Sequence, residues 1–119
     1  MNTTRIAIIS DMKQVNLKTE ETQTVRITLG GRNYSLRIYP FRGLMYADVT
    51  RNKEYVLAGK RIMANQWVLP LYYTAGKGNF RFETYIADRN SYVWYEDFNS
   101  KFRLVIYDGE EIAEMRDGE

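Results

Sequence analysis

The sequence predicts an all-β fold: a small antiparallel barrel or sandwich of about six to seven strands, with a short N-terminal arm and an acidic C-terminal tail. Apolar and polar residues alternate over several short stretches, the period-two pattern of strands with one buried face. Gly, Asn and Asp residues separate these stretches, and no long segment has a helical period. At 119 residues the chain is expected to form one domain.

The first 21 residues are predicted to be an arm and a connector. Arg5–Ser10 alternates weakly and is rich in Ile, which fits a short strand or an arm that pairs with another chain. Asp11–Glu21 is polar with isolated Val15 and Leu17, and is expected to connect the arm to the domain. The N-terminal apolar run is too short for a signal peptide, so the chain is expected to be made and kept in a cytoplasm.

The domain is predicted over residues 22–109 and begins with a hairpin. Apolar residues alternate from Val25 to Leu29 and again from Tyr34 to Ile38. Gly30-Gly31 between them suits a tight two-residue turn, because Gly tolerates positive φ. Pro40 cannot donate to a strand ladder and is expected to end the second strand or to mark its edge.

Five further segments complete the predicted strands. Leu44–Thr50 and Tyr55–Ala58 are expected to be the third and fourth strands, with Gly59 as a bulge or a close backbone approach. Trp67–Tyr73 contains a Pro and is expected to be an edge strand or a loop that caps the core. The last clear strands are predicted over the alternating segments Phe80–Ile86 and Phe102–Tyr107.

The acidic tail, residues 110–119, is expected to form one or two helical turns, with Ile112 and Met115 on one face. It contributes to a strong charge asymmetry. Residues 1–81 carry 13 Lys/Arg against 5 Asp/Glu, a balance of +8, and residues 82–119 carry 4 against 10, a balance of −6. This asymmetry favours neutralisation within one fold or head-to-tail contact with a partner.

The residue inventory argues against an enzyme. The chain has no His and no Cys, which removes the commonest general base, disulfides and the usual zinc ligands. Glu96-Asp97 is the nearest approach to an acid/base pair, but adjacent strand residues point to opposite faces and cannot flank one bond. We therefore expect no catalytic residues, no metal site and no cofactor.

Aromatic and basic side chains are the candidates for partner contact. The ten Tyr and two Trp exceed what so small a core is expected to enclose, and Tyr, Trp and Arg are enriched at protein interfaces. Neighbouring rings in Tyr72-Tyr73 and Trp94-Tyr95 are expected on opposite strand faces. The candidate interface residues are Ile6, Ile8, Trp67, Tyr72, Tyr73, Trp94, Tyr95, Arg32, Arg37 and Arg42.

Two alternatives remain open at this point. Interleaved basic and aromatic residues, as in Arg37-Ile38-Tyr39, are also used by barrels of the OB type that bind single-stranded nucleic acid. Trp94 and Tyr95 fit a carbohydrate-binding subunit as well. Aromatic residues at alternate strand positions are, however, more often part of a core.

The order of several short motifs resembles a known family. The segment Leu29–Ile38 fits the form L-x-G-x-x-Y-x-L-x-I, and further matching segments follow at Met45–Val49, Val56–Ile62, Gly78–Phe82 and Phe102–Tyr107. Together they resemble the small baseplate plug proteins of contractile-tailed bacteriophages, the cyanophage type in particular. The resemblance covers residues 22–108, while the segment before it, Trp67 and Tyr72-Tyr73 have no clear counterpart.

The resemblance implies a structural virion protein in the tail baseplate, a plug at or near the central hub. It implies contacts with hub, tube-initiator and spike proteins and several copies around the tail axis. It requires no nucleic-acid contact and no membrane. Assembly in the cytoplasm of the bacterial host would follow.

Overall fold

The chain folds mainly into β-strands, in a computed structural model that describes residues 4–6, 14–70, 78–85 and 92–117. The strands in chain order are β1 (Thr4–Ile6), β2 (Gln14–Val15), β3 (Gln23–Leu29), β4 (Arg32–Phe41), β5 (Leu44–Arg51), β6 (Glu54–Arg61), β7 (Asn79–Thr84) and β8 (Phe102–Tyr107). A 3-10 turn, η1 (Tyr95–Asp97), precedes β8, and the helix α2 (Gly109–Asp117) follows it.

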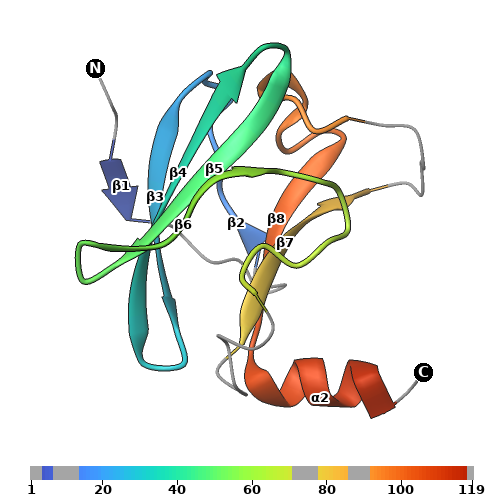
Figure 1. Cartoon of the computed structure of the whole chain (residues 1–119). Coiled ribbons are helices and arrows are strands. Elements are labelled where there is room, and N and C mark those ends of the chain that lie inside the picture. Colours follow the sequence, from blue (N-terminus) through green and yellow to red (C-terminus); the bar gives the residue numbers. More distant parts are fainter. Residues whose placement is uncertain (1–3, 7–13, 71–77, 86–91, 118–119) are drawn as a thin grey trace.

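These strands form two sheets that share one core (Figure 1). The first sheet has the order β1-β3-β4-β5-β6, and the second has the order β2-β8-β7. All pairings between these strands are antiparallel except that of β1 with β3. The prediction of an all-β fold is confirmed, and the two sheets do not close into a barrel of the OB type.

The β3–β4 hairpin follows the predicted pattern. Gly30 and Gly31 both have positive φ, 58° and 75°, and the register pairs Leu29 with Arg32 across the turn. Strand β4 continues through Pro40, which pairs with Met45 of β5. Since β3 begins opposite Ile38, this Pro lies where β4 has a neighbour on one side only, as the edge prediction requires.

The N-terminal segment contributes to both sheets. Thr4–Ile6 pairs in parallel with Thr24–Arg26 of the same chain. Within the predicted connector, Gln14–Val15 forms a short strand beside β8, and Val15 and Leu17 are buried. Val15 and Leu17 stand out in the sequence as isolated apolar residues. The strand itself was not predicted, because a two-residue strand is too short to show a period-two pattern.

The shared core consists of the inward-facing residues of both sheets together with residues from the connecting loops. Phe82 of β7 stacks on Phe98 with ring centroids 5.9 Å apart. The fully or almost fully buried side chains include Ile27, Tyr34, Leu36, Ile38, Met45, Leu69, Phe80, Phe82, Phe98, Phe102 and Leu104. The helix α2 projects from the end of β8, away from β1 and β3 (Figure 1).

A buried amide connects the loop before β7 to that strand. Asn79 is completely buried, its Oδ1 accepts hydrogen bonds from the backbone N–H of Leu69 and Phe80, and its Nδ2 donates to Leu69 O at 2.9 Å. Asn79→Ala would leave buried backbone groups of Leu69 unpaired. We expect it to lower the free energy of unfolding by about 2–3 kcal/mol, measured by urea denaturation.

The exposed Asn33 is the matched control for this prediction. It accepts a hydrogen bond from Thr28 Oγ1 at 2.8 Å at the surface, where water replaces a lost partner. Asn33→Ala is expected to change stability by no more than about 0.5–1 kcal/mol. Equal losses at the two positions would contradict the role given to the buried amide.

Candidate protein interface

Each sheet turns one face to the core, so the alternate residues of each strand form an outer face. On the five-stranded sheet this outer face carries a group of charged and aromatic side chains that we call the aromatic sheet face. Its members are Arg26, Arg37, Tyr39, Phe41, Arg42, Tyr46 and Asp48. It contains two of the basic candidates that the sequence analysis identified, Arg37 and Arg42.

Asp48 organises the aromatic sheet face. Its Oδ1 accepts hydrogen bonds from Tyr39 Oη at 3.0 Å and from the backbone N–H of Gly59 at 2.6 Å. Arg37 Nη1 approaches its Oδ2 at 3.5 Å. Burial together with the hydrogen bond to this carboxylate raises the pKa of Tyr39.

The bond from Gly59 to Asp48 accounts for the irregularity predicted in β6. Gly59 has a positive φ of 65°, and the β5–β6 register shifts between Ala47 and Thr50. The backbone N–H of Gly59 therefore turns to the Asp48 carboxylate. This confirms the bulge or close approach expected at Gly59.

The rings of this face contact one another and the arginines. The ring centroids of Tyr39 and Tyr46 lie 6.2 Å apart in a stacked arrangement, and Phe41 meets Tyr46 edge-on at 6.0 Å. Arg37 lies 4.5 Å from the centroid of Tyr39, and Arg42 lies 5.2 Å from that of Phe41. Phe41 is 54% exposed, so apolar surface remains open to a partner.

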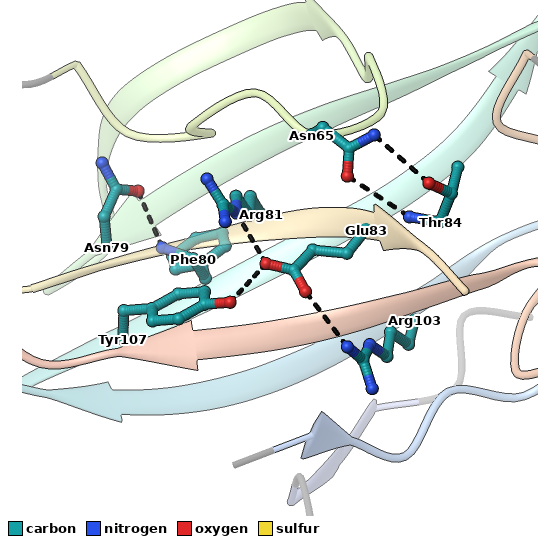
Figure 2. Close-up of polar contacts among 8 residues, drawn as sticks. All are labelled: Asn65, Asn79, Phe80, Arg81, Glu83, Thr84, Arg103 and Tyr107. Atoms are coloured by element: carbon teal, nitrogen blue, oxygen red, sulfur yellow. Dashed lines mark hydrogen bonds and ion pairs between the residues drawn. The ribbon is translucent and has the colours of Figure 1, made fainter. Parts of the chain in front are cut away.

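The outer face of the three-stranded sheet has a different character. We call its central group the Glu83 cluster: Glu83 with Arg81, Arg103 and Tyr107 (Figure 2). Arg81 Nε donates to Glu83 Oε2 at 2.6 Å, and Arg103 Nη2 donates to Oε1 at 3.4 Å. Tyr107 also donates its hydroxyl proton to Oε2. The carboxylate is thus held by one residue of its own strand and two of β8.

The electrostatics of the Glu83 cluster favour the ionised carboxylate. Burial acts to raise the pKa of Glu83, but the hydrogen bonds from Tyr107 and Arg81 and the charges of Arg81 and Arg103 outweigh it, so the pKa is lowered. Burial and the bond to this carboxylate raise the pKa of Tyr107. Both arginines form ion pairs with Glu83 inside the cluster, so the cluster is not an open site for an anionic partner.

Trp67 packs against this cluster. Its ring lies 4.6 Å from the Arg81 guanidinium and meets the Tyr107 ring at a right angle with centroids 5.4 Å apart. An isolated bridge also pairs Trp67 with Arg81. Of the predicted segment Trp67–Tyr73, Trp67 is joined to β7 by this single bridge, and residues 71–73 lie outside the described residues. Trp67 is partly covered by its own chain.

Trp94 and Tyr95 do not lie on opposite faces of a strand, which corrects the expectation for this pair. Both residues stand at η1, where the chain turns, and their ring centroids are only 5.0 Å apart. Trp94 Nε1 donates to Glu96 at 3.1 Å, and Tyr95 donates to Glu21 at 3.4 Å. The dipeptide lacks the alternation of a strand, and its local turn brings the rings together.

The remaining candidates are scattered. Arg32 stands at the first position of β4, next to the Gly30-Gly31 turn and at the opposite end of that strand from Arg42. Ile6 ends β1 at the edge of the first sheet. Ile8, Tyr72 and Tyr73 lie outside the described residues.

Several residues of the two faces were not among the candidates. On the aromatic sheet face these are Arg26, Tyr39, Phe41, Tyr46 and Asp48, and in the Glu83 cluster all four members. The signal for the cluster was the spacing Arg81-x-Glu83 beside Arg103-x-x-x-Tyr107, which places alternate polar residues on one face of a strand. The cross-strand register that brings them together is a tertiary property.

Within the parts of the chain that the structure describes, no three Asp or Glu side chains gather as metal ligands would. No described helix has the length and apolar character needed to cross a bilayer.

Fold and surface together define a small all-β domain with a partly aromatic outer face on its five-stranded sheet. A family model described as "Cyanophage baseplate Pam3 plug gp18" matches residues 12–110. No curated protein matches the chain significantly. Since the matched region is most of the sequence, the chain belongs to this family of phage baseplate plugs, and it is a structural component of the virion tail.

The match begins at residue 12, ten positions before the resemblance noted in the sequence. It therefore includes β2, whose pairing with β8 ties this segment to the domain.

Proposed function

We propose that this protein is a plug at or near the central hub of the baseplate, where it holds hub, tube-initiator and spike proteins together without catalysing a reaction. The observation that supports this role is the family match over residues 12–110. The aromatic sheet face is the contact surface we assign to it. Tyr and Arg are the residue types that most often dominate binding energy at interfaces.

The geometry of that face supports a binding role. Asp48 fixes Tyr39 and the bulge at Gly59 through short hydrogen bonds, so the rings are held in position before a partner arrives. A preorganised surface loses less side-chain entropy on binding than a mobile one. In contrast, the cations of the Glu83 cluster already have a carboxylate partner in the chain.

Mass spectrometry of purified tails tests the proposed location. We expect the chain at a fixed stoichiometry relative to hub and spike proteins, and cross-links from the aromatic sheet face to one of them. Absence from tails that contain a complete baseplate would refute the proposal.

Phe41→Glu tests the contact surface. It places a charge on the most exposed ring of the face and should reduce incorporation into tails at least about tenfold, since interface anchors are worth about 2 kcal/mol or more. The measure is the amount of the chain per tail in a complementation assay. Tyr92→Glu, at another highly exposed ring, is the control and should incorporate normally.

A further inference from the structure

The acidic helix and the basic part of the aromatic sheet face lie on different sides of one molecule. α2 projects from β8 away from the five-stranded sheet, and it makes no extensive contact with any other described element (Figure 1). The charge asymmetry of the sequence is therefore not neutralised by α2 meeting this face within one chain. It remains as two separate surfaces.

The helix presents two of its acidic residues, Glu110 and Glu114, to solvent. Glu110, Ala113 and Glu114 are exposed, whereas Ile112 and Met115 are half-buried. Residues four apart share one face of a helix, with about 5–6 Å between their Cβ atoms. Glu110 and Glu114 therefore form a pair of carboxylates at a fixed spacing.

The start of the helix is fixed by a reciprocal capping interaction. Asp108 Oδ1 accepts a hydrogen bond from the backbone N–H of Glu111 at 2.8 Å, and Glu111 Oε1 accepts one from the backbone N–H of Asp108 at 2.9 Å. This capping box orients the first turn. The carboxylate pair is thus presented on a defined element rather than on a free tail.

The sheet face offers a matching pair of cations. Arg37 stands opposite Thr24 in the β3–β4 register, so Arg26 is its diagonal neighbour on the same face, about 7–8 Å away. Arg26 is exposed, and the Arg37 side chain is 41% exposed. Arg37 contacts Asp48 through Nη1, and a guanidinium carries five N–H donors, so donors remain for a second carboxylate.

We propose that α2 of one copy docks on the aromatic sheet face of a second copy, with Glu110 and Glu114 paired to Arg26 and Arg37. The inference rests on the proposed function. It assigns the Arg26 and Arg37 part of the face to another copy of this chain, and leaves the Phe41 end to the other baseplate proteins. Because the two surfaces differ, the contact is heterologous and repeats from copy to copy, which closes a ring or extends a chain. A ring would suit a component arranged around the tail axis.

A protein partner fits this face better than nucleic acid. Two carboxylates on a helix need only two cations as partners, whereas a strand of nucleic acid needs a continuous row of cations.

Sedimentation velocity of the purified full chain tests the proposal. We expect concentration-dependent self-association at about 0.05 M salt that weakens at about 0.5 M salt, because exposed ion pairs are screened. Arg26→Glu with Arg37→Glu, and separately Glu110→Arg with Glu114→Arg, should each weaken association at least about tenfold. Lys18→Glu with Lys101→Glu, two exposed residues outside the contact, is the control of equal charge change.

The decisive measurement mixes the two reversed variants. Each should be monomeric alone, and together they should associate, because the charges are complementary again. Monomers at every concentration, or no recovery in the mixture, would overturn the inference. Loss of single-stranded DNA binding in the arginine variants, without self-association of the parent, would assign the face to nucleic acid instead.

The docking of α2 and the proposed baseplate role can fail independently of each other. A chain that does not self-associate but is present in purified tails would refute the docking of α2 and leave the baseplate role intact. Self-association of a chain absent from tails would do the reverse. Circular dichroism of each variant verifies that it is folded.

Discussion

Gly78→Ala is expected to lower the free energy of unfolding by about 3–5 kcal/mol, the sum of backbone strain and overpacking. Gly78 has a φ of +107°, a conformation that L side chains rarely adopt. An added Cβ would lie 2.6 Å from the carbonyl oxygen of Tyr107 and 2.8 Å from Leu29 Cδ1. The backbone oxygen cannot move away without disturbing the β7–β8 pair, so the cost is unavoidable.

Gly43→Ala separates the two contributions to this prediction. Gly43 also has positive φ, 79°, but nothing lies within 4 Å of its added Cβ. Gly43→Ala should therefore lower the free energy of unfolding only by the cost of backbone strain, about 1–2 kcal/mol. Urea denaturation of both variants measures the difference. Equal losses of unfolding free energy would show that the added methyl group at Gly78 does not clash with Tyr107 and Leu29.

Gly78 also illustrates what the sequence could and could not predict. Gly78 and Asn79 are among the Gly, Asn and Asp residues that separate the predicted strands, and they stand directly before the strand predicted from Phe80. The pattern contained nothing about Leu29, which lies about fifty residues away in the chain. Its close approach to Gly78 depends on how the two sheets pack.

The strongest strands were predictable for a simple reason. In β3, β4 and β5 the buried positions alternate strictly with more exposed ones, so the period-two signal matches the burial. The acidic end was likewise predicted to form helical turns, and α2 forms there. These elements are specified by local patterns.

Elements that depend on contacts with distant parts of the chain were not predicted. Strand β2 has two residues and exists because β8 offers a free edge. η1 brings Trp94 and Tyr95 together at a point where a strand was expected. The aromatic sheet face was recognised in part, through Arg37 and Arg42, because charge is visible in sequence. Asp48 was not, because a single carboxylate shows its role only once Tyr39 and Gly59 surround it.

Glu83→Gln is expected to lower the free energy of unfolding by about 3 kcal/mol at neutral pH. The substitution preserves shape but leaves Arg81 and Arg103, whose side chains are 22% and 24% exposed, without their anionic partner. Removing one member of a buried pair costs about 3–5 kcal/mol, and the partial exposure of the arginines places the expected loss at the lower end. Glu114→Gln, at an exposed carboxylate, should change stability by less than about 0.5 kcal/mol.

The pH dependence distinguishes charge from packing in this cluster. Because folding lowers the pKa of Glu83, the unfolded chain binds more protons in the acidic range, and the stabilisation is lost as pH falls through the folded pKa. The difference between parent and Glu83→Gln should therefore be largest at neutral pH and shrink below the usual value of 4.5. Urea denaturation at several pH values measures it. A difference that stays constant on acidification would mean that shape, rather than the ionised carboxylate, holds the two strands together.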